Sequence, residues 1–136
     1  MEDISIVTIP LNLKEFRDAG LNIDDKTKNR VIAGIIQGTL TTYVTLFLAT
    51  YFAKGGNPED MVSTLTMLAN SLKDIDKVVG VEDSGDEVDI HFRFPSKIPE
   101  EKVFEIMHII PKMVLLSMIL ENETKKSEKL GKYFAE

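Results

Sequence analysis

The stretch VIAGIIQGTLTTYVTLFLATYFA, residues 31–53, decides the fold of this chain, because it holds no charged side chain over its whole length. A run this long and this apolar is typical of a buried helix and exceeds the usual length of a strand. Asp24 or Asp25 can cap its start, and Gly55 favours a helix end after Lys54. We therefore predict a central helix over about residues 25–54, buried on nearly all sides.

The two sides of this helix differ in side-chain size when it is plotted at 100° per residue. The large side carries Ile32, Ile36, Leu40, Tyr43, Val44, Phe47 and Tyr51. The small side carries the candidate interface residues Gly34, Gly38, Thr41, Thr45 and Ala49. Small side chains let a second helix approach closely, whether that helix comes from the same chain or from a second copy. We expect a homodimer, because a chain of 136 residues has few elements to cover such a helix.

A membrane span is the alternative interpretation of residues 31–53, since their number is sufficient to cross a bilayer. Gly34 and Gly38 also have the spacing of a GxxxG pair. Gln37 and five threonines lower the hydrophobicity of the run, and the remaining segments need a common core. We therefore expect no membrane span, and membrane anchoring by residues 31–53 stays an alternative.

The segments on either side of the helix predict a small antiparallel sheet. Residues 4–9 form a β-branched strand, with Ile4, Ile6 and Thr8 on one face and Pro10 at its end. Residues 78–94 predict a hairpin around the polar turn 83–86. Its second strand alternates apolar and polar residues, with the apolar set being Val88, Ile90, Phe92 and Phe94.

Two further helical regions complete the predicted fold. Asn57 and Pro58 open a helix over residues 57–75. Residues 99–134 form a C-terminal helical region that we expect to be kinked near Pro111. Its expected inner face carries Val103, Ile106, Ile110, Met113 or Val114, Ser117 and Leu120. The whole chain, residues 1–136, is predicted to be a single α+β domain with a three-stranded sheet.

The composition limits the classes of function. A net charge of −6 without a basic stripe argues against nucleic acid as a partner. The absence of cysteine excludes disulfides and thiolate chemistry. The N-terminus lacks the pattern of a signal peptide, so we expect this acidic protein to be cytoplasmic. Abundant isoleucine, lysine and glutamate with a single glutamine suit a thermophilic source.

Candidate chemistry is sparse. Glu105 and His108 have the E-x-x-H spacing of helical metal sites, but such sites use two of these motifs and further carboxylates. Asp89, His91 and Arg93 share the polar side of the hairpin, where we expect cross-strand charge pairs with Glu82. We predict no metal, no cofactor and no enzymatic activity.

We predict a non-enzymatic, dimeric interaction or regulatory module that uses the small side of the long helix together with the C-terminal helix. The first alternative is a protein that binds an apolar small molecule between the long helix and the sheet. The residues of that candidate pocket are Tyr43, Phe47, Tyr51 and Met61. The second alternative is the membrane-anchored protein described above.

Overall fold

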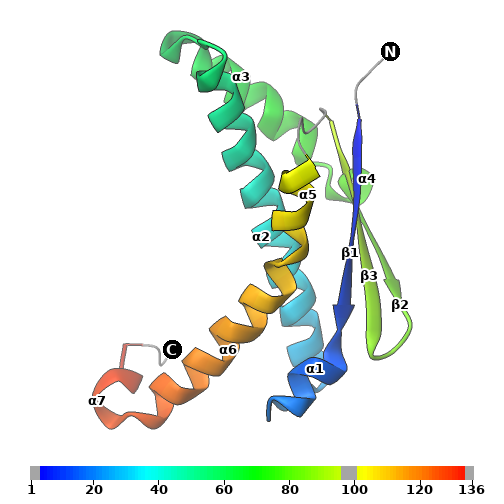
Figure 1. Cartoon of the computed structure of the whole chain (residues 1–136), viewed down its shortest axis with the longest axis vertical. Helices are drawn as coiled ribbons and strands as arrows, with labels where there is room; N and C mark the ends of the chain where they lie inside the picture. Colours follow the sequence, from blue (N-terminus) through cyan, green and yellow to red (C-terminus); the bar gives the residue numbers. More distant parts are fainter. Residues whose placement is uncertain (1–3, 96–100, 134–136) are drawn as a thin grey trace.

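The computed structural model describes residues 4–95 and 101–133, and it confirms the predicted α+β fold (Figure 1). The sheet is antiparallel with strand order β1-β3-β2. Its strands are β1 (Ser5–Asn12), β2 (Val79–Asp83) and β3 (Glu87–Phe94). Figure 1 shows the long helix α2 (Asp25–Ala53) and the C-terminal helices α5 (Glu101–His108) and α6 (Ile110–Lys126) on the same side of this sheet.

Strand β1 differs from its prediction in length and in orientation. It continues past Pro10, because β1 is an edge strand and a proline is tolerated where its missing N–H is not needed by a neighbouring strand. Its buried face carries Ser5, Val7, Ile9 and Leu11. Ile6 is exposed, so the face on which the sequence placed Ile4, Ile6 and Thr8 is not the face that packs in the core.

The core lies between the sheet and the helices. All four alternating apolar residues of β3 are fully buried, as the hairpin pattern indicates. The ring of Tyr43 in α2 stacks on Phe94 with 4.1 Å between centroids and 7° between planes. Aromatic stacking of this kind adds about 0.5–1.5 kcal/mol beyond the burial of the two rings. Tyr43 therefore fixes α2 against the end of β3.

The tip of the hairpin is tied to the helices by charge. Lys28 Nζ donates to Asp83 Oδ1 at 2.7 Å and to the Gly85 carbonyl at 2.9 Å. The Lys28 hydrogen bond, helped by the Gly85 N–H, holds the pKa of the Asp83 carboxyl below its usual value. Gly85 adopts a φ of +93°, a conformation that glycine takes without strain. Arg17, in the short helix α1 (Leu13–Asp18), forms an ion pair with Asp86.

Helix α2 has the predicted ends but less burial than predicted. Asp24 caps its start by accepting from the Thr27 N–H at 2.8 Å, and Gly55, with a φ of +81°, follows its end. We expected burial on nearly all sides, yet only Val31, Ile35, Thr39 and Tyr43 are fully buried. The predicted large side is partly exposed instead, because residues four apart, beginning at Val31, face the sheet.

The remaining helices follow the predicted segments with changed boundaries. The predicted helix 57–75 is α3 (Pro58–Leu72), and a separate turn, α4 (Ile75–Val78), leads into β2. The C-terminal region is split near Pro111, as predicted, into α5 and α6, and a short helix, α7 (Glu128–Gly131), follows. Its predicted limits, residues 99 and 134, lie outside the described residues.

Thr39 is a fully buried residue of α2 that carries a hydroxyl group. Its Oγ1 atom has no hydrogen-bond partner within the part of the chain that the structure describes. We expect Thr39→Val to raise the free energy of unfolding by about 1–3 kcal/mol, because a methyl group replaces an unsatisfied buried hydroxyl. Urea denaturation measures this change. Thr42→Val is the control: the Thr42 hydroxyl donates to the Gly38 carbonyl at 2.8 Å, so an equal gain there would contradict the explanation.

Candidate functional site

A row of large apolar side chains lies exposed along α5, α6 and the residue between them. Each of its members is 45–59% exposed. The row, here called the α5–α6 stripe, consists of Ile106, Ile109, Met113, Leu116 and Leu120. Its members alternate spacings of three and four residues, the a and d pattern of a helix that packs against another helix. The surface is therefore suited to a partner helix.

The predicted inner face of the C-terminal region is partly right. Ile110 is buried and Val114 packs against the core, as predicted. Ile106, Ser117 and Leu120 were expected to face the core, but they are exposed, and Met107 and Met118 pack there instead. The side chain of Val103 lies outside the described part of the chain. Helices α5 and α6 each carry two apolar rows on different sides, and the sequence does not show which of the two rows packs against the sheet and α2. The 3-4-3-4 spacing from Ile106 to Leu120 was the signal for the exposed row.

Two residues of the predicted interface on α2 lie against α6 of the same chain. A Cβ atom added to Gly38 would come within 3.3 Å of Ile110 Cγ2, and one added to Gly34 within 3.9 Å of Val114. A helix thus approaches closely at both glycines. Thr41, Thr45 and Ala49 are exposed beside them, and the Thr45 hydroxyl donates to the Thr41 carbonyl at 2.9 Å.

The residues of the predicted apolar pocket lie along the second half of α2 and at the start of α3. Tyr43 is buried against Phe94, with Phe47 at 6.4 Å between ring centroids. Tyr51 packs edge-on to Phe52 and donates its hydroxyl to the Asn57 carbonyl at 2.8 Å. Phe47, Tyr51 and Met61 are partly exposed. Aromatic packing fills the space between Tyr43 and the sheet at this point.

The candidate metal ligands Glu105 and His108 both lie on α5 and are exposed. Glu105 is exposed, and His108 Nδ1 donates to the Phe104 carbonyl of its own helix at 2.6 Å. His108 also lines a cleft of about 400 Å³ with Glu15, Glu87, Asp89 and Lys112 among its walls. Among the side chains described for residues 4–95 and 104–133, no group of three His, Asp or Glu residues is placed to hold a metal ion.

His91 joins the three strands on the outer face of the sheet. Its Nε2 lies 3.0 Å from Glu82 Oε1 on β2, and its Nδ1 lies 2.8 Å from Thr8 Oγ1 on β1. The Glu82 contact is the cross-strand pair that the hairpin pattern indicates. This arrangement stabilises the order of the strands. His91 lines neither the cleft beside His108 nor the cleft between α2 and α6.

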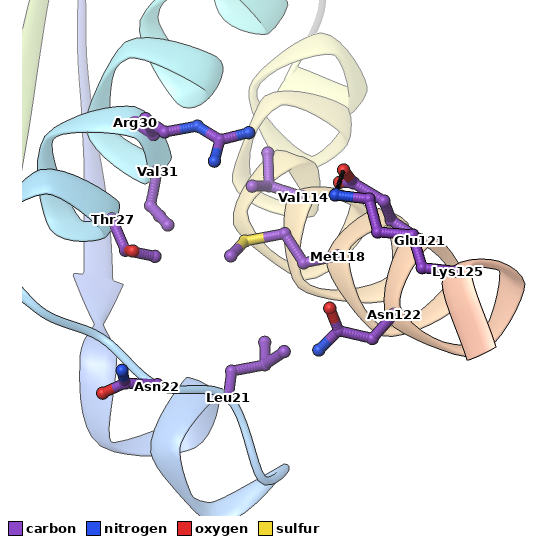
Figure 2. Close-up of a pocket in the computed structure, with 10 residues that line it drawn as sticks. All are labelled: Leu21, Asn22, Thr27, Arg30, Val31, Val114, Met118, Glu121, Asn122 and Lys125. Atoms are coloured by element: carbon purple, nitrogen blue, oxygen red, sulfur yellow. Dashed lines mark ion pairs between the residues drawn. The ribbon is translucent and has the colours of Figure 1, made fainter. Parts of the chain in front are cut away.

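A second cleft, of about 290 Å³, lies between the start of α2, the segment before it and α6 (Figure 2). Leu21, Val31, Val114 and Met118 form its apolar part. Its polar part is formed by Asn22, Thr27, Arg30, Glu121, Asn122 and Lys125. This cleft could not be predicted from sequence patterns, because its two walls are about ninety residues apart and neither carries a recognisable motif.

Comparisons with models of known protein families, with curated proteins and with solved structures found no match. A function for this protein therefore has to be inferred from the surfaces of the molecule.

Proposed function

We propose that the protein is a non-enzymatic interaction or regulatory module that works as a homodimer, with the α5–α6 stripe as its contact surface. The observation that carries this proposal is the exposed a and d row from Ile106 to Leu120. Exposed apolar patches of this continuity mark sites of association in soluble proteins. The small side of α2 enters only through Thr41, Thr45 and Ala49, since Gly34 and Gly38 already face α6.

The charges beside the stripe favour a second copy in antiparallel orientation. In the register that sets Met113 opposite Leu116 of the second copy, Ile109 faces Leu120, and Glu105 faces Lys126. Opposite charges then flank the apolar contact at both ends of the dimer. A shift by one heptad in either direction sets Lys112 opposite either another Lys112 or Lys126, and like charges disfavour those registers. A parallel pair would form none of these charge pairs.

The contacts of α2 favour a place in the core, rather than in a membrane, for the apolar run of residues 31–53. It is long and apolar enough to cross a membrane by length and composition. However, Val31, Ile35 and Tyr43 are buried against other parts of the same chain. In a membrane these residues would lose the sheet that covers them, and β1 and β3 would lose their packing partner. Membrane anchoring is therefore the lesser candidate.

The molar mass of the detergent-free protein, measured by light scattering on a sizing column, tests the proposal. We expect twice the chain mass of 15.3 kDa at micromolar concentration. A mass of one chain at all accessible concentrations would overturn the proposal.

A charge reversal tests the antiparallel register. We expect Glu105→Lys and Lys126→Glu each to weaken the dimer, because each sets like charges against each other twice. The double variant should recover most of the lost affinity, because the pair is then reversed. Local effects of Lys126→Glu, which also breaks its 3.2 Å ion pair with Glu123, are not recovered by a change at residue 105. Absence of recovery would therefore contradict this register.

A further inference from the structure

We propose that the cleft between α2 and α6 binds a small organic carboxylate whose body is apolar. The cleft, shown in Figure 2, has a volume of about 290 Å³, at the small end of the range for ligand sites. This binding function goes beyond dimerisation.

The apolar part of the cleft comes from three separate segments. Leu21 precedes α2, Val31 lies in its second turn, and Val114 and Met118 lie one turn apart on α6. Figure 2 shows the four side chains pointing toward a common space from both sides. Methionine adapts its shape to a ligand readily, so this surface suits a short aliphatic chain or a single ring.

Charge selects the polar end of the ligand. Arg30 is exposed, and its guanidinium extends from α2 toward Val114 on the opposite wall (Figure 2). Among the described residues it has neither an ion pair nor a hydrogen bond to its side chain. Lys125, the other cation of the cleft, is paired with Glu121 at 3.0 Å. One unpaired positive charge thus remains over an apolar surface, in a chain of net charge −6.

A carboxylate fits this arrangement better than other anions or a neutral ligand. Its two oxygens match the paired donors of one guanidinium. A phosphate dianion would need a second free cation and would leave the apolar surface unused. A neutral apolar ligand would cover Arg30 without offering it an acceptor, which costs free energy. Asn22, Asn122 and Thr27 can donate further hydrogen bonds, and the first turns of α2 add the positive end of a helix dipole.

The cleft and the α5–α6 stripe use different sides of α6. Val114, Met118 and Glu121 face α2, whereas Met113, Leu116 and Leu120 face away from it. A dimer formed through the stripe leaves the cleft open, so binding and dimerisation can be measured independently of each other.

Titration with hexanoate, followed by NMR of the methyl groups of Leu21, Val31, Val114 and Met118, tests the site. We expect saturable shifts of these methyl signals in the wild type. Arg30→Gln should weaken hexanoate binding about ten-fold or more, since it removes a charged hydrogen-bond donor. Arg93→Gln removes an exposed arginine on the other face of the sheet and should leave binding unchanged.

1-Hexanol, which has the same chain without the charge, should bind more weakly than hexanoate and should respond little to Arg30→Gln. Three results would each overturn the proposal. These are the absence of saturable shifts with hexanoate, equal hexanoate affinity of Arg30→Gln and the wild type, and an affinity for 1-hexanol equal to that for hexanoate.

Discussion

Leu116→Lys is expected to convert the dimer into a monomer. Leu116 lies in the middle of the α5–α6 stripe, and in the proposed register it contacts Met113 of the second copy. The substitution affects both halves of a two-fold interface. A central apolar contact contributes about 2 kcal/mol, so two of them correspond to a rise in Kd of about 1,000-fold. Sedimentation equilibrium at several protein concentrations measures this change.

Val62→Lys is the matched control for this prediction. Val62 lies on α3, is 69% exposed and does not belong to the stripe, so the same change of side chain there should leave the dimer intact. Circular dichroism of both variants should match that of the wild type, because neither residue is part of the core. An unaltered Kd for Leu116→Lys, or an equal loss in Val62→Lys, would show that the stripe is not the interface.

Gly38→Leu is expected to lower the free energy of unfolding. A Cβ atom at this position already meets Ile110 Cγ2 at 3.3 Å, and the rest of a leucine side chain would push α6 away from α2. Overpacking of this kind costs about 1–3 kcal/mol, which exceeds the helix propensity gained by removing a glycine. Urea denaturation in the Leu116→Lys background measures the effect without a contribution from dimerisation.

Gly34→Ala provides the comparison one turn earlier on the same helix. Its new Cβ would meet Val114 at 3.9 Å, an ordinary van der Waals contact. We expect this variant to be more stable than the wild type by about 0.5–1 kcal/mol, since alanine is the better helix former. If Gly38→Leu leaves the monomeric protein as stable as before, the close approach of α6 to α2 at Ile110 is wrong.

The elements of the fold could be predicted wherever a pattern was local and regular. The alternation of β3, the Asp24 cap and the break at Pro111 each depend on neighbouring residues alone. The orientation of β1 could not be predicted in this way. Both of its faces carry β-branched residues, and the choice of face depends on the register of Ser5 with Phe94, far away in the sequence.

The surfaces were harder to predict than the core, for the same reason. The expected close approach at Gly34 and Gly38 depends only on side-chain size, and the structure places α6 there. Which apolar row of α5 and α6 stays exposed depends on how that helix is rotated against α2. Likewise, Arg30 has no special place in the sequence, and only the approach of Met118 makes it part of a cleft.

The pairing of β1 with β3 has a consequence for biosynthesis. Ser5 is aligned with Phe94, so β1 finds its partner β3 only after the ribosome has translated the long segment between them. Contacts between such distant segments form slowly, because a long loop must close before they stabilise the chain. Until then α2 has emerged without the sheet that covers Val31 and Tyr43. The nascent chain therefore passes through an interval in which its most apolar segment is available to chaperones.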